Sequence, residues 1–83
     1  MLKRFWFVFK PSAESSVLEM GCGVTAYDRA DAEKLLEEQA FPLYGARSID
    51  KVVEDVDVST LDEKHIRPNM GNPAARGVWF PLV

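Results

Sequence analysis

The sequence has few of the residues that cross-link small domains or catalyse reactions. It contains one cysteine, Cys22, and one histidine, His65. A single cysteine excludes an intrachain disulfide, and this pair falls short of the four ligands of a structural zinc site. We therefore predict no metal ion and no other cofactor. Association into a homodimer is the remaining way in which so short a chain can gain stability.

Long apolar runs are missing as well. The N-terminal run at residues 5–9 ends at Lys10 and Pro11, whereas the apolar part of a signal peptide needs about 7–15 residues. No stretch approaches the roughly 20 apolar residues of a membrane-spanning helix. We expect a cytoplasmic protein that does not enter a membrane and that keeps its cysteine reduced.

Motifs of known chemistry are also lacking. The sequence has no phosphate loop, dinucleotide fingerprint, zinc pattern or calcium loop. Cys22 and His65 are the only candidates for a nucleophile and its base. Because Cys22 lies in an alternating apolar pattern, it is more simply a small buried hydrophobe. We predict a non-enzymatic domain with no catalytic residue, and keep a small enzyme that uses this pair as an alternative.

The composition is typical of one folded domain spanning residues 1–83. Hydrophobic residues make up 47% and aromatic residues 11%, and the net charge is −3. All 13 acidic residues lie within residues 14–63, while residues 1–13 and 64–83 contain only basic charged side chains. The net negative charge argues against nucleic-acid binding, because contacts with phosphates dominate the affinity for nucleic acids.

Hydrophobic periodicity predicts four strands. Residues 2–10 form a strand that is apolar on both faces, which favours a central position in a sheet. Residues 17–27 alternate, with Gly21 and Gly23 on one face, and we expect an aromatic such as Trp6 to lie over this bare backbone. Residues 48–58 form a third strand with either a bulge or two partly covered faces. Residues 78–83 form a short last strand, which Pro81 restricts to an edge or ends.

Two helices are predicted between these strands. The main helix, residues 28–40, begins at Asp28 as N-cap and ends before Pro42 and Gly45. A short second helix, residues 60–66, follows from the capping box of Thr60 and Glu63. The element order is therefore β-β-α-β-α-β.

This order predicts an α+β two-layer sandwich. The strand–helix–strand crossover should place the second and third strands parallel, and the first two strands should form a hairpin. We therefore predict a mixed sheet of three to four strands with one main helix on one face. The other face needs the C-terminal segment or a second subunit as its cover.

The segment HIRPNMGNPAARGVWFP, residues 65–81, has no regular periodicity until its last residues. Prolines stiffen it, glycines allow tight bends, and arginines can hold carboxylates or phosphates bidentately. Rigid loops of this kind often carry function. We predict that it binds a protein partner or a small anionic ligand, or alternatively that its arginines bridge to acids near residues 54–57 and pin the tail. The predicted contact residues are His65, Arg67, Asn69, Asn72, Arg76 and Trp79.

Together with VTAYD at residues 24–28 and DAEKLL at residues 31–36, this segment resembles small bacterial single-domain proteins of unassigned function. The resemblance implies a cytoplasmic bacterial protein and carries over no catalytic residue. We predict a binding or interaction domain. The alternative within this class is an immunity-type inhibitor that blocks a toxin through the acidic helix.

Overall fold

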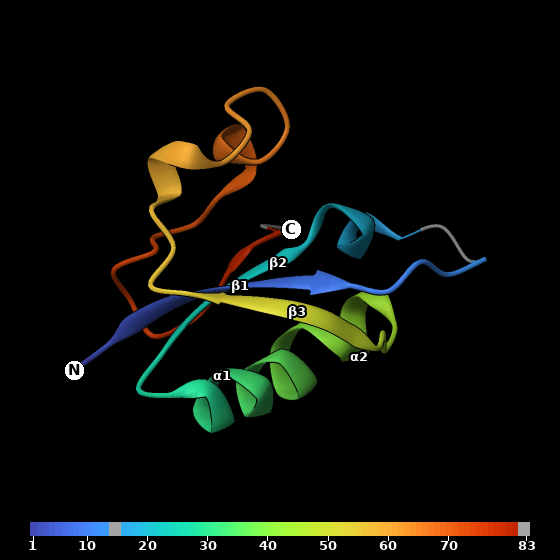
Figure 1. Ribbon diagram of the computed structural model, residues 1–83, viewed down its shortest axis with the longest axis horizontal. Helices are drawn as coiled ribbons and strands as arrows, with labels where there is room; N and C mark the ends of the chain where they lie inside the picture. The colour runs from blue at the N-terminus through green and yellow to red at the C-terminus, as the bar shows by residue number, and fades with distance from the viewer. Residues whose placement is uncertain (14–15, 82–83) are drawn as a thin grey trace.

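The structure, a computed structural model, describes residues 1–13 and 16–81. Its centre is a four-stranded sheet in the order β3-β1-β2-β4. The strands are β1 (Lys3–Phe9), β2 (Cys22–Ala26), β3 (Ile49–Glu54) and β4 (Gly77–Phe80). The helices cover one face of the sheet, and the segment between β3 and β4 lies over the other (Figure 1). This is the predicted α+β architecture.

The strand pairing corrects one part of the prediction. β1 pairs antiparallel with both β2 and β3, and β2 pairs antiparallel with β4. β2 and β3 therefore run parallel, as the crossover requires, but β1 lies between them. Every neighbouring pair is antiparallel, so the predicted mixed sheet is wrong. The two apolar faces of β1 explain its central position. A strand with apolar side chains on both faces buries most apolar surface in the middle of a sheet that is covered on both sides.

The second predicted strand is shorter than expected. Residues Val17–Met20 form a 3-10 turn, η1, and the Leu18 amide in its first turn donates a hydrogen bond to the Ser16 hydroxyl. Gly21 follows with a φ of +106°, a conformation that redirects the chain into β2. As a result Leu18 reaches the core, whereas Met20 is 39% exposed.

The main helix is longer than predicted and contains a π-helical turn. Asp28 caps α1 (Arg29–Leu35), and its carboxylate accepts a hydrogen bond from the Asp31 amide at 2.8 Å. The helix continues through η2 (Leu36–Ala40) and α2 (Phe41–Tyr44). In the π turn the Phe41 amide donates to the Leu36 carbonyl, five residues back. Pro42 then sits in the first turn of α2, where a missing N–H is tolerated, and Gly45 ends the helix.

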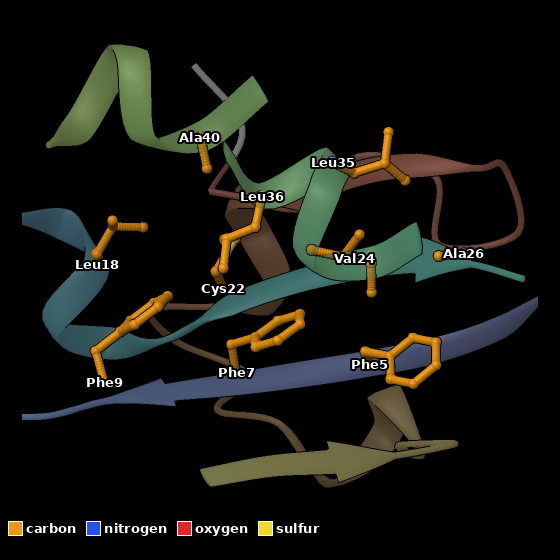
Figure 2. Packing of buried hydrophobic residues seen from close by; sticks show 11 residues of the cluster. Phe5, Phe7, Phe9, Leu18, Cys22, Val24, Ala26, Leu35, Leu36 and Ala40 are labelled. Carbon is orange, nitrogen blue, oxygen red and sulfur yellow. The ribbon is translucent and has the colours of Figure 1, made fainter. Parts of the chain in front are cut away.

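A helix-facing core joins the sheet to this helix. Side chains of β1 and β2 point toward the helix and meet its apolar stripe (Figure 2). A register shift between Val8 and Phe9 lets both Ile49 and Val52 of β3 reach this core, which confirms the bulge alternative. The buried members are Phe5, Phe7, Phe9, Leu18, Cys22, Val24, Ala26, Ala32, Leu35, Leu36 and Ala40.

The predicted second helix at residues 60–66 is not formed. The chain instead makes two separate 3-10 turns, η3 (Val58–Thr60) and η4 (Arg67–Asn69). The expected capping box fails because Asp57 caps η3, and the Thr60 hydroxyl donates back to the Asp57 carbonyl at 2.6 Å. Short polar side chains such as Asp and Thr compete with helix formation through local hydrogen bonds of this kind.

β4 is an edge strand, as predicted, but it spans Gly77–Phe80. The predicted strand also included residues 82 and 83, which lie outside the described residues. The Val78 amide donates to the Gln39 side-chain oxygen at 3.0 Å, so the helix satisfies part of this edge. Within residues 1–13 and 16–81, no helix has the length and apolar character needed to cross a membrane.

Candidate functional site

The segment of residues 55–76, here called the C-terminal loop, covers the second face of the sheet. Val56 and Ile66 are buried on its inner side. They pack against an aromatic layer formed by Trp6, Trp79 and Phe80. The C-terminal segment, one of the two covers that we predicted, thus lies over this face. The loop has an apolar inner side and a polar outer side.

Trp79 anchors the C-terminal end of the loop inside the molecule. Its side chain is only 2% exposed, and its ring centroid lies 5.9 Å from that of Trp6. The backbone of Gly23 lies directly under the Trp79 ring, and Gly21 lies under the ring of Trp6. The two glycines therefore make room for aromatic side chains, as the sequence predicted. Trp79 packs internally in this structure and does not line the outer surface.

Arg76 ties the loop to the start of the main helix. Its Nε and Nη2 donate to the two carboxylate oxygens of Asp31, at 3.0 and 2.5 Å. The guanidinium carbon also lies 5.8 Å from the ring centroid of Tyr27, a distance typical of a cation–π contact. Arg76 thus bridges to an acid of the middle region, although the partner is Asp31 rather than an acid near residues 54–57.

This ion pair changes the pKa of both partners. The hydrogen bond from Arg76, followed by that from the Tyr27 amide, lowers the pKa of Asp31 from 3.8 to about 2. The Asp31 carboxylate in turn raises the pKa of Arg76. Because the pKa of Asp31 is depressed in the folded state, its ionisation stabilises the fold above about pH 4. That stabilisation is lost as the pH falls through about 2.

Arg76→Ala is expected to raise the pKa of Asp31 from about 2 toward 3.8. The variant should be less stable than the wild type at neutral pH, and the difference should shrink as the pH falls from about 4 to about 2. NMR titration of the Asp31 carboxyl and urea unfolding across this range measure both effects. Arg29→Ala, which removes the helix pair with Glu33, is the control. An unchanged pKa of Asp31 in Arg76→Ala would contradict the assignment.

The outer side of the loop carries polar side chains with local partners. His65 Nδ1 lies 3.1 Å from Asp62 Oδ2, and the side-chain Nδ2 of Asn69 donates to the His65 carbonyl at 2.9 Å. Arg67 Nη1 lies 3.8 Å from Glu63 Oε2, and both side chains are well exposed. An exposed pair of this length contributes little to stability. Arg67 is therefore held loosely, in contrast to Arg76.

Side-chain and backbone hydrogen bonds fix the second half of the loop. Asn72 Oδ1 accepts from the Ala74 amide at 2.9 Å, which closes a tight turn. The Thr25 hydroxyl donates to the Pro73 carbonyl, and the Gly71 amide donates to the Trp79 carbonyl, both at 2.6 Å. The turn around Asn72 is therefore attached to β2 and to β4.

Cys22 and His65 lie on opposite sides of the sheet. Cys22 is fully buried in the helix-facing core, and its burial raises the pKa of the thiol to about 12. His65 is exposed on the loop that covers the other face. The structure therefore does not bring together the nucleophile and base that the enzyme alternative requires.

We expect Cys22 to be inert in the folded protein. A thiol reagent at pH 8 should label it only as fast as the core opens, because the thiolate is disfavoured and covered. Absorbance of the released thiol product, with and without denaturing urea, measures this. Rapid labelling of the native protein at its full stoichiometry would contradict the buried position.

A depression lies at the edge of the loop, and none of the predicted contact residues lines it. Leu2, Arg4, Thr25 and Asp55 line it, together with Pro73 and Ala74. One signal was present in the sequence, since Arg4 shares the parity of Trp6 and Val8 in β1. A charged residue at an inward position of an apolar strand is unusual. No group of three or more potential metal ligands occurs in the described part of the chain.

Comparisons with known proteins identify no relative, so the function is argued from the geometry of the site alone. No protein-family model, no curated protein and no solved structure matches the chain. The resemblance to small bacterial proteins therefore stays a prediction.

Proposed function

We propose that the chain is a non-enzymatic protein-binding domain whose contact surface is the outer side of the C-terminal loop. The observation that carries the proposal is the division of the loop into two sides. Its inner side is held by Ile66 and the aromatic layer. Its outer side presents Lys64, His65, Arg67 and Asn69, all exposed. A long irregular segment that is held rigidly is a common carrier of function.

The chemistry of this surface favours an acidic partner. Lys64 and Arg67 are exposed cations, and the pair of Arg67 with Glu63 is loose enough to exchange for a better carboxylate. Asn69 is fixed by its bond to the His65 carbonyl and leaves its side-chain oxygen as a further acceptor. Little ordering entropy is lost when a loop of this kind binds, because its turns are already formed.

The acidic helix is the alternative surface, as an immunity-type inhibitor would require. Two of its acids have basic neighbours one turn away, at 3.4 Å for Glu33 with Arg29 and at 4.0 Å for Glu38 with Lys34. These pairs reduce the field that a basic partner would meet. Glu37 is exposed and suits a test of this surface.

The experiment compares capture of partners by charge variants of both surfaces. Purified protein is immobilised and exposed to an extract of the cells it comes from, and bound proteins are quantified by mass spectrometry. For a partner of the loop, the double variant Lys64→Glu with Arg67→Glu should reduce capture at least about ten-fold. Lys34→Glu also replaces a cation by an anion, but in α1 on the opposite face of the sheet. This control variant should capture the partner as well as the wild type does.

Two outcomes would count against the loop surface. If Glu37→Lys abolishes capture and the loop variants do not, the helix is the interface. If only Arg76→Ala changes capture, and does so in proportion to its loss of stability, the loop is a structural clasp. A homodimer is tested in parallel by sedimentation equilibrium of the wild type and the loop double variant.

A further inference from the structure

The outer side of β3 is an unpaired edge of the sheet. β3 is the first strand in the order β3-β1-β2-β4, and β1 is its one partner among residues 1–13 and 16–81. At the opposite edge, the Gln39 side chain accepts a hydrogen bond from the Val78 amide. No side chain of the described residues makes such a bond to the backbone of residues 51–54. Free backbone groups of this kind can form a ladder with a further strand.

Residues 51–54 keep a regular alternation along this edge. They pair with residues 5–8 of β1 without a register shift. Val53 is the partner of Trp6, so Val53 and Lys51 lie on the face that the C-terminal loop covers. The other two side chains lie on the helix face. Val53 is nevertheless 41% exposed, which leaves an apolar side chain at the rim of the sheet.

The charged side chains around Val53 have no ion-pair partner in their own chain. Asp50, Lys51, Glu54 and Asp55 are all exposed. None of them forms an ion pair with another residue of the described ranges. Unpaired charges on an edge strand either keep other strands away or select a strand that carries the matching charges. The order of the charges along the strand decides between the two.

A second copy of β3 can add to this edge in only a few registers. A two-fold axis perpendicular to the sheet relates two such strands, which then run antiparallel. Side chains that lie directly opposite each other point to the same face. The axis must therefore pass between a residue and the same residue of the second copy. Within the regular stretch, this residue is one of the four at positions 51–54.

Charge disfavours three of these four registers. An axis at Lys51 or at Glu54 sets that charged side chain against its own copy. An axis at Val52 brings Asp50 to Glu54 of the second copy, at both ends of the pairing. Like charges that lie opposite each other destabilise a strand pair.

The fourth register places the axis at Val53. The two Val53 side chains then cover each other, and Lys51 lies across from Asp55 of the second copy on both sides of the axis. We propose that two copies of the chain associate through β3 in this register and join their four-stranded sheets into one continuous sheet.

The contact in this dimer is short. Because few residues of each copy take part, the buried area falls below the roughly 1,200 Å² of stable complexes, and we expect a Kd of about 100 µM. Lys64, His65 and Arg67 are not part of the contact. The dimer is therefore independent of the protein-binding surface proposed above.

Disulfide trapping tests the register. Directly opposite residues of an antiparallel pair have Cα atoms about 4.5–5.5 Å apart, within the range that a disulfide spans. Val53→Cys should therefore form an intermolecular disulfide in a glutathione buffer at a protein concentration near the Kd. Asp50→Cys is the matched control, because its two copies lie about 20 Å apart along the strands. Non-reducing electrophoresis should show at least ten-fold more dimer for Val53→Cys, and the buried Cys22 should not contribute.

A charge exchange tests the pairing of Lys51 with Asp55. Lys51→Glu alone and Asp55→Lys alone each set like charges opposite each other on both sides of the axis. Sedimentation equilibrium should therefore show self-association weakened at least ten-fold. A one-to-one mixture of the two variants restores opposite charges at both positions and should associate as the wild type does. Lys34→Glu, in α1, should also associate as the wild type does.

The proposal is overturned if the wild type stays monomeric at ten times the expected Kd, because the charges then keep other strands away from β3. It is also overturned if Val53→Cys forms no more dimer than Asp50→Cys, or if Lys51→Glu associates as strongly as the wild type. Circular dichroism reports whether each variant is folded. If Asp55→Lys, at a φ of +55°, does not fold, the two cysteine variants and Lys51→Glu still decide.

Discussion

Gly23→Ala is expected to destabilise the protein by about 3 kcal/mol or more, the upper range of overpacking in a core. An added Cβ would overlap the six-membered ring of Trp79. That ring is 2% exposed and backed by Trp6, so it has little space into which it can move. Urea unfolding monitored by circular dichroism measures the change in the free energy of unfolding.

Gly45→Ala is the matched control. An added Cβ there has no neighbour within 4 Å, so only the strain of its φ of +90° applies, with an expected cost of about 1–2 kcal/mol. Trp79→Leu should partly rescue Gly23→Ala, so that the double variant is more stable than the sum of the two single changes predicts. A Gly23→Ala protein as stable as Gly45→Ala would show that the ring does not lie on this backbone.

Ile66→Ala is expected to lower the free energy of unfolding by about 2–4 kcal/mol, the usual cost of emptying a buried isoleucine site. Ile66 is 8% exposed and is one of the two buried side chains by which the C-terminal loop covers the aromatic layer. Loosening the loop admits water to Trp6 and Trp79. Tryptophan emission should therefore shift to longer wavelength, and fluorescence with urea unfolding measures both effects.

Leu43→Ala is the control for this second change. Leu43 is 68% exposed on the helix side of the sheet, so its loss should alter stability by no more than about 0.5 kcal/mol. If Ile66→Ala has an equally small effect and unchanged emission, the loop does not provide the cover. A second subunit would then be the better candidate for that face.

These two changes also bear on the proposed function. A loop that is anchored by Ile66, Trp79 and the Arg76–Asp31 pair presents its outer cations in a defined arrangement. Variants that loosen the anchors should weaken partner binding indirectly, together with stability. Variants of Lys64 and Arg67 should weaken binding at unchanged stability, and this difference separates contact residues from supporting ones.

Local patterns predicted the elements whose signals lie within a few residues. Asp28 as N-cap, the apolar stripe of the main helix and Gly45 at its end follow from caps and periodicity. The close approach of aromatics to Gly21 and Gly23 also followed from glycine within a strand. The π turn before Pro42 was not predicted, because one inserted residue in a helix leaves no clear periodic signal.

The site was predicted less well than the fold. Arg67 and Arg76 look equivalent in the sequence, yet Arg76 is clamped bidentately by Asp31, which lies 45 residues away in the chain. Arg67 has only a loose pair with Glu63, one turn away. Arg4 was read as part of a basic N-terminus, because its register partner Thr25 and the loop edge are remote in the sequence.

By itself, the sequence determined the α+β class, a central first strand, the capped helix and a rigid, basic C-terminal segment. These depend on propensity, capping and periodicity, which act over one or two turns or strand repeats. Only the tertiary structure decided that every strand pair is antiparallel, that the loop covers the aromatic layer, and which arginine is clamped. These depend on contacts between residues far apart in the chain, whose free energies no local pattern encodes.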